Sequence, residues 1–260
     1  MQTLQRNPAV AHRITWQKLP SDFILPDEPV ESTLQPLLAA ALRESLELAG
    51  LILESMIIAS NFGICANVDG KTVVKAPDWV YIPCANPSAE VRRSYTPHAE
   101  GGNAEIVMEF ISATEGTEYS INPNYPYGKW YFYEQILKIP VYAIFHPPTG
   151  ILEVYRLQDG KYQIQEPDPN HLPNQLFWLE SIGLFLGVWE GQKAENQGYW
   201  LRWWDQSGNL LLWGHELIEQ QRQLVEEQRQ LTEEQRQLKE QAEQRANYLA
   251  EKLRSLGVEP

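Results

Sequence analysis

The sequence predicts an α/β fold in which helices flank a mixed sheet and a long helix follows at the C-terminus. Three observations predict it: a helical pattern over residues 34–50, short aliphatic runs between 51 and 165 around a second helical segment, and a seven-residue repeat after 215. We expect an irregular lead over 1–33, one domain over 34–214 and a helical tail over 215–260. With 260 residues and 43% hydrophobic composition, the chain can form one sizeable core.

The first helix is predicted over 34–50. Apolar residues recur there every three or four positions between Leu37 and Leu48, and Gly50 is a typical helix stop. The stretch "NVDGKTVV" then places Asp69-Gly70 between two strand-like runs, which predicts a hairpin. Residues 83–103 are rich in Pro, Asn, Ser and Gly and are expected to form a long loop.

The second half of the domain begins with a predicted strand, "AEIVMEFIS", at residues 104–112. A helix is expected over "GKWYFYEQILK" because its spacing is helical and it ends before Pro140. The runs "VYAIFH", "ILEVYRL" and "KYQIQEP" are predicted strands separated by turns. From about residue 166 we expect a Trp-rich β extension, with a hairpin around Ser207-Gly208-Asn209.

The tail is a long helix with a repeat of seven residues, "QRQLVEE", "QRQLTEE" and "QRQLKEQ". In a coiled coil, two apolar positions of each repeat form the seam along which the helices touch. Leucine occupies one of these positions here but glutamine occupies the other, so the apolar seam is thin, with only one apolar residue per repeat. Two interpretations stay open: a coiled coil that joins copies of the chain into a homo-oligomer, and a solvated helix that packs its last turns on the body.

Composition and charge limit the function classes. Of the 34 acidic and 21 basic residues, the tail holds ten and seven, which leaves the body with 24 and 14. This argues against a broadly basic nucleic-acid surface but permits a local groove or a metal beside carboxylates. Cys65 and Cys84 are expected to be reduced, buried thiols. Without an apolar run of signal or membrane-span length, we expect a soluble, cytoplasmic protein with no membrane association.

One residue is out of place in this pattern. Glu109 interrupts the apolar run of its predicted strand, and burying a carboxylate is costly. Asp78 opens another strand-like run, "DWVYIP", and the two acids face the same point if these strands pair. Lys129 follows near the start of the second helix, where Tyr133 lies one turn further on the same face. Two carboxylates suit Mg²⁺, and a nearby lysine can stabilise a phosphate or act on a water.

The quoted motifs "PDWVYI", "VMEFIS" and "GKWYFYEQ", in this order, resemble the Uma-type restriction-endonuclease family of the PD-(D/E)XK nuclease superfamily. The similarity covers about residues 35–165 and the closing "LAEKLRSLGVEP". The resemblance implies that Asp78, Glu109 and the backbone carbonyl of Phe110 bind Mg²⁺ or Mn²⁺, and that Lys129 is catalytic. The superfamily's usual lysine position holds Ile111 here, so the lysine is displaced to the following helix.

Other residues are candidates for supporting the site. Tyr133, Ser112 and His98 could lie beside the metal ligands, although His98 alone in a loop is more often structural or exposed. Some superfamilies add a carboxylate from the first helix. Glu44 and Glu47 are available there and Glu54 lies just beyond it, without a preference among them.

The function expected from these observations is Mg²⁺-dependent hydrolysis of phosphodiester bonds in DNA, an endonuclease activity. The alternative is a catalytically inactive module with the same scaffold, which binds or regulates and forms an oligomer through its C-terminal helix.

Overall fold

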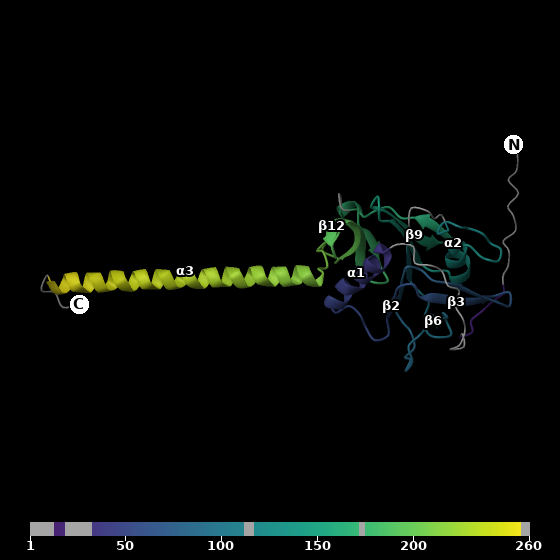
Figure 1. Ribbon diagram of the computed structural model, residues 1–260, viewed down its shortest axis with the longest axis horizontal. Helices are drawn as coiled ribbons and strands as arrows, with labels where there is room; N and C mark the ends of the chain where they lie inside the picture. The colour runs from purple at the N-terminus through teal and green to yellow at the C-terminus, as the bar shows by residue number, and fades with distance from the viewer. Residues whose placement is uncertain (1–12, 19–32, 112–116, 172–174, 256–260) are drawn as a thin grey trace. The chain divides into compact units, whose positions relative to one another are not determined.

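A computed structural model describes residues 13–18, 33–111, 117–171 and 175–255 of the chain (Figure 1). The predicted mixed α/β architecture is confirmed. The chain divides into two compact units, residues 1–211 and residues 212–260. The first unit contains the three sheets, and the second consists mainly of the long helix α3.

The central sheet of the first unit has six strands. Only β7 and β8 run parallel, and the other neighbours are antiparallel, so the sheet is mixed as predicted. Strands β5, β7 and β8 are buried along almost their whole length, as their continuous apolar runs require. In spatial order the strands are β10 (Lys161–Ile164), β9 (Ile151–Gln158), β8 (Val141–His146), β7 (Ile106–Phe110), β5 (Trp79–Ile82) and β2 (Ile57–Ala59).

The connection between β7 and β8 has to cross over because these two strands are parallel. It includes the short α-helix α2 (Lys129–Tyr131), which continues directly as the π-helix η1 (Phe132–Leu137). The predicted helix is therefore present, but most of it has the wider π geometry. It ends at Lys138, which has a left-handed φ of 52°, two residues before Pro140.

A second sheet contains β1 (Ile14–Thr15), β3 (Gly63–Val68), β4 (Lys71–Lys75) and β6 (Ser94–Tyr95). The predicted hairpin joins β3 to β4, and positive φ angles of 52° at Asp69 and 81° at Gly70 close its turn. Two predictions need correction. The lead over 1–33 contributes β1, which pairs with β3, and the loop over 83–103 contains β6, which also pairs with β3.

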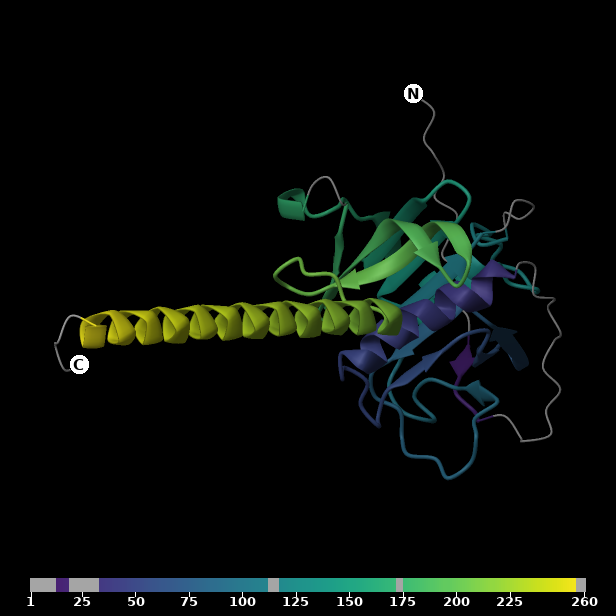
Figure 2. The ribbon, with the colours of Figure 1, turned by 60° about the vertical axis from the view of Figure 1, so that its left-hand side comes forward.

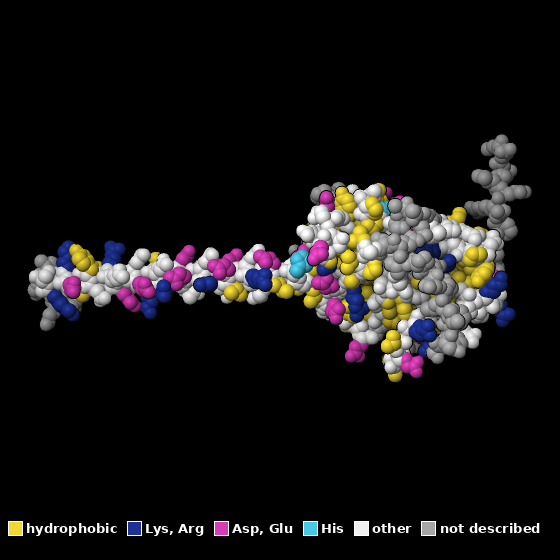
Figure 3. All heavy atoms as spheres, viewed as in Figure 1, with side chains coloured by type: hydrophobic (Ala, Val, Ile, Leu, Met, Phe, Trp, Pro, Cys, Tyr) yellow, Lys and Arg dark blue, Asp and Glu magenta, His cyan; other side chains and the backbone are white. Residues whose placement is uncertain are grey.

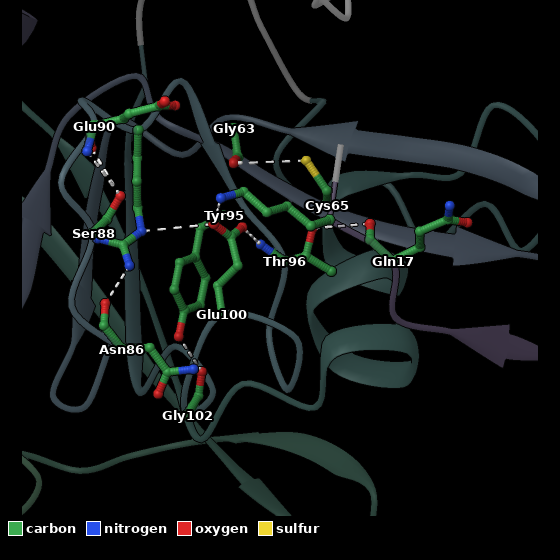
Figure 4. A network of polar contacts seen from close by, with 12 residues as sticks. Gln17, Gly63, Cys65, Asn86, Ser88, Glu90, Tyr95, Thr96, Glu100 and Gly102 are labelled. Carbon is green, nitrogen blue, oxygen red and sulfur yellow. Dashed lines mark hydrogen bonds and ion pairs between the residues drawn. The ribbon is translucent and has the colours of Figure 1, made fainter. Parts of the chain in front are cut away.

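A polar network around the buried carboxylate of Glu100 holds the loop that carries β6 (Figure 4). Glu100 accepts a hydrogen bond of 2.9 Å from the backbone N–H of Thr96. The side chains of Arg92 and Lys18 lie 3.7 and 3.6 Å from its other oxygen. Because Lys18 comes from a separate stretch of the chain, the network fixes the long loop against the residues that follow β1.

The Trp-rich extension forms a third, antiparallel sheet of β11 (Phe177–Leu179), β12 (Leu184–Lys193) and β13 (Asn196–Trp204). The chain reverses direction around residues 207–209 as predicted, although the antiparallel pairing there is short. The long hairpin is β12–β13, which turns at Ala194 and Glu195. Asp205 accepts hydrogen bonds from the backbone of Ser207 and Asn209 and closes only a tight turn. Trp204 and Leu210, on either side of this turn, form a single antiparallel bridge.

Helix α1 (Leu34–Leu48) confirms the first predicted helix, and Gly50 follows it with a φ of 69°. Figures 1 and 2 show it beside the β12–β13 hairpin. The indole N–H of Trp203 donates to the carbonyl of Leu42 over 3.1 Å, and the Trp203 ring lies 5.8 Å from that of Trp79. This contact joins α1, the third sheet and the start of β5.

The expectation of two buried thiols holds for Cys65 and is wrong for Cys84, which is exposed. Strand β5 ends at Ile82, and Pro83 has no N–H with which to continue the ladder. Cys84 therefore lies beyond the buried part of the strand.

Helix α3 (Gly214–Ser255) is 42 residues long and buries none of its described side chains. Its polar composition fits this exposure. Among the described residues, no helix has the length and apolar character that crossing a membrane requires.

The packing of α1 can be tested with two leucines of the same helix. Leu46 is 1% exposed and Leu48 is 48% exposed. We expect Leu46→Ala to lower the free energy of unfolding by about 2–5 kcal/mol, because it leaves a cavity in the core. Leu48→Ala serves as the control and should cost less than about 1 kcal/mol in the same urea titration. Equal losses would show that this face of α1 is not the packed one.

Candidate functional site

The pairing of β5 with β7 brings the two predicted acids to one place. Trp79 pairs with Met108, so the register carried one residue further sets Asp78 opposite Glu109. Opposite residues of an antiparallel pair project to the same side of the sheet. The carboxylate of Asp78 also accepts a hydrogen bond of 2.6 Å from the backbone N–H of Phe110. This bond fixes Asp78 against the end of β7.

Glu109 is fully buried, with 0% of its surface exposed, and both of its oxygens have partners. The ammonium of Lys129 lies 3.2 Å from one oxygen. The hydroxyl of Tyr133 donates a hydrogen bond of 2.9 Å to the other. The two helical residues on the predicted common face therefore converge on the unusual glutamate of β7.

Close packing at the start of α2 aims Lys129 at this point. A Cβ on Gly128 would lie 2.0 Å from the carbonyl oxygen of Ser120, so only glycine fits there. The same carbonyl accepts a hydrogen bond from the backbone N–H of Tyr131. The helix can consequently begin directly against the loop, with the side chain of Lys129 pointing toward β7.

Glu118 is a third carboxylate at the site and was missed from the sequence. Its side chain is buried, and one oxygen lies 3.6 Å from the ammonium of Lys129. The hydroxyl of Tyr142, on β8, donates to its backbone carbonyl and fixes the residue. The other carboxylate oxygen is buried without a hydrogen-bond partner among the described residues. No local pattern marks Glu118, because it lies in a polar loop where an acidic residue is ordinary.

Helix α1 contributes a side-chain amide to the site and none of the three acids that were considered as additional ligands. The side chain of Gln35 donates a hydrogen bond of 2.7 Å to the carbonyl of Phe110, the predicted backbone ligand. Glu44 forms an ion pair of 2.5 Å with Lys193. Glu47 and Glu54 are exposed. Gln35 was not singled out in the sequence, since a glutamine in the first turn of a helix carries no signal of its own.

The residue two positions after Glu109, where the resemblance places a lysine, is an isoleucine that is buried in the core. Ile111 is buried in the main core cluster, and its backbone N–H donates to the carbonyl of Phe145 over 2.8 Å. His98 has a left-handed φ of 65°, and its ring packs edge-on against Trp16 at 5.0 Å. Ser112 lies outside the described residues.

Burial and charge set the protonation at the site. Burial raises the pKa of Glu109 to about 8, although the adjacent Lys129 opposes the shift. Burial lowers the pKa of Lys129, but the carboxylates of Glu109, Glu118 and Asp78 outweigh it, so the pKa rises above its ordinary value. Lys129 is therefore held as an ammonium ion.

The donor set fits a hard divalent cation. Asp78 and Glu109 offer carboxylate oxygens and Phe110 a carbonyl, while Mg²⁺ binds through one or two carboxylates and keeps several waters. Three acidic side chains, with Glu118, lie around a single ammonium, so a bound cation would favour the ionised form of Glu109. Within the part of the chain that the structure describes, no group of three or more His, Cys, Asp or Glu side chains forms a ready-made metal cluster.

Residues 24–182 match the Uma2 model, whose description is putative restriction endonuclease. The match spans α1, the central sheet and the segment that carries Asp78, Glu109 and Lys129. No protein of the curated collection matches the chain.

The environment of Glu109 leads to a prediction about stability and pH. Its pKa rises from the ordinary 4.5 to about 8 on folding. A raised carboxyl pKa contributes stability at low pH, which is lost as the pH rises through this window. Without metal, raising the pH from 4.5 to 8 should therefore destabilise the wild type but not Glu109→Gln. The difference in free energy of unfolding between the two should shift in favour of the variant by up to about 5 kcal/mol. Urea unfolding in EDTA at several pH values measures this difference, and parallel profiles would contradict the buried, protonated carboxyl.

Proposed function

The chain belongs to the Uma2 family, and on that premise we propose that it is an endonuclease that hydrolyses phosphodiester bonds of DNA with Mg²⁺ or Mn²⁺. The observation that supports the proposal most strongly is the meeting of Asp78, Glu109 and Lys129 at one end of the β5–β7 pair. A carboxylate pair next to an ammonium suits the hydrolysis of a phosphate ester better than it suits a merely structural ion pair.

The metal would be held by the carboxylates of Asp78 and Glu109 and the carbonyl of Phe110. A bound divalent ion makes a coordinated water more acidic and offsets charge on the phosphate. The hydrogen bond from Phe110 N–H orients Asp78, and the Gln35 amide orients the Phe110 carbonyl. Tyr133 holds the side chain of Glu109 in its rotamer.

Lys129 acts in this proposal as a fixed positive charge and not as a base. Three carboxylates raise its pKa, so it keeps its proton at neutral pH. Its ammonium would then offset the negative charge that develops on the phosphate in the transition state. Glu118 touches the same ammonium and would act through it, as a positioning residue.

One observation favours the alternative of an inactive binding or regulatory module. The superfamily's lysine position holds the buried Ile111, and the ammonium of Lys129 is already shared by Glu109 and Glu118. Measurements of metal binding and of cleavage separate the two functions, because the module requires neither.

We expect nicking of supercoiled plasmid DNA in Mg²⁺ or Mn²⁺ and none in EDTA. Asp78→Asn, Glu109→Gln and Lys129→Met should each lower the rate by about a hundredfold or more, through loss of metal ligands or of transition-state charge. Glu44→Gln is the matched control, since its carboxylate pairs with Lys193 away from the site, and it should keep the wild-type rate. Folded wild type with neither calorimetric metal binding nor nicking would establish the inactive module.

A separate variant tests the part assigned to Glu118. Glu118→Gln should lower the nicking rate about tenfold to a hundredfold, a range typical of residues that orient a catalytic group. Its affinity for Mn²⁺, measured by calorimetry, should stay close to the wild-type value because Glu118 acts on Lys129. A large loss of metal affinity would instead make Glu118 a ligand, and an unchanged rate would remove it from the site.

A further inference from the structure

Helix α3 exposes a straight line of leucines. Four of them recur at intervals of seven residues, and between 37% and 65% of the surface of each is in contact with solvent. Ile218 and Val225 widen the line near its start and are also exposed. The four are Leu217, Leu224, Leu231 and Leu238. An α-helix repeats every 3.6 residues, so this spacing keeps them on one side over about four heptads.

The charged residues of the same helix are concentrated on a different side. Glu219, Glu226, Glu233 and Glu240 also recur every seven residues, two positions after each leucine. Arg222, Arg229 and Arg236 follow three residues after the first three of these glutamates. Arg236 lies 2.9 Å from Glu233 and 3.8 Å from Glu240. Figure 3 shows these charges along α3, with hydrophobic side chains exposed between them.

We propose that α3 pairs with α3 of a second copy of this chain in a parallel, in-register, two-stranded coiled coil. In heptad terms the leucines occupy the d positions, and the glutamate and arginine pairs occupy the outward f and b positions. A second copy is the occupant because its leucine line has the same spacing over the same length. The described helix of 42 residues is about 63 Å long, which is ample for such a contact.

The glutamines between the leucines decide the orientation. Gln221, Gln228 and Gln235 occupy the a positions of the same seam. In a parallel, in-register pair each glutamine lies beside its own copy, and the two amides can hydrogen-bond. In an antiparallel pair a positions face d positions, so glutamine amides would lie against leucine without partners. The thin seam is therefore weaker than an all-apolar one but selects a single register.

Charges beside the seam favour the same arrangement. Glu234 is at a g position and Lys239 at the following e position. In a parallel pair, residue g of one helix faces the next e residue of its partner, so Glu234 meets the partner's Lys239 twice per dimer. The heptad of the leucines extends to Ala242, beyond which Arg245 and Lys252 stand at the d positions. The apolar Ala246 and Leu253 stand one position later, so the apolar pattern shifts register in the C-terminal part of the helix.

This inference does not depend on the nuclease chemistry, and none of its tests measures cleavage. The mass of the full chain in solution is the first test. We expect a dimer by light scattering at micromolar concentration, and a monomer for the double variant Leu224→Ser with Leu231→Ser. The control, Gln223→Ser with Gln230→Ser, changes neighbouring positions of the outer surface in the same two heptads and should remain a dimer. A monomeric or trimeric wild type, or equal effects of both double variants, would overturn the proposal.

A cysteine placed near one end of α3 tests the orientation. In a Cys84→Ser background, Gln221→Cys should form a disulfide-linked dimer on mild oxidation, because parallel helices bring residue 221 beside its copy. In an antiparallel pair that overlaps along the whole of α3, the two thiols would be about 40 Å apart and could not react. Gln223→Cys is the control and should not cross-link. A cross-link at neither site in a proven dimer, or equally at both, would contradict the parallel register.

Charge reversal tests the pairing of Glu234 with the partner's Lys239. Lys239→Glu should weaken dimerisation about tenfold, because two attractive contacts become repulsive. Adding Glu234→Lys to that variant should restore the wild-type dissociation constant, measured by sedimentation equilibrium. Further weakening by the second change would exclude this register.

Discussion

The structure around the candidate site depends on how one buried carboxyl group is kept in the apolar strand β7. Glu109 has no access to solvent, so its charge or its proton must be balanced by neighbours. Lys129 and Tyr133 provide that balance from the crossover segment, and Asp78 faces it from β5. A core strand would be more stable with an apolar residue at this position. Because perturbed carboxyl groups cluster at active sites, this costly glutamate supports the proposal that the site is functional.

The parallel pairing of β7 and β8 explains why the lysine can be supplied from outside the strand. A parallel neighbour requires a crossover, and the crossover places α2 and η1 beside the end of β7. A lysine two residues after Glu109 is then unnecessary, and Ile111 is free to join the core. The same segment delivers Glu118, so the ammonium is held between two carboxylates.

The sequence predicted those parts of the molecule that local patterns determine. Spacing alone identified α1 and α3, the Asp69-Gly70 turn and the strands of the central sheet, because each rests on periodicity or turn chemistry within a few residues. It missed features that arise only from packing. Glu118 lies in a polar loop and is buried by Tyr142, and Gln35 reaches β7 from a helix distant in sequence. The short pairings of β1 and β6 with β3, and the π geometry of η1, likewise have no local signature.

The central claim is that one divalent ion binds between Asp78 and Glu109. A crystal of the full chain soaked in Mn²⁺ and measured at an X-ray wavelength where manganese scatters anomalously tests this directly. The account predicts a single strong anomalous peak within coordination distance, about 2.0–2.3 Å, of carboxylate oxygens from both residues. An ordered site without any such peak at saturating Mn²⁺, with Lys129 still bound to Glu109, would contradict it.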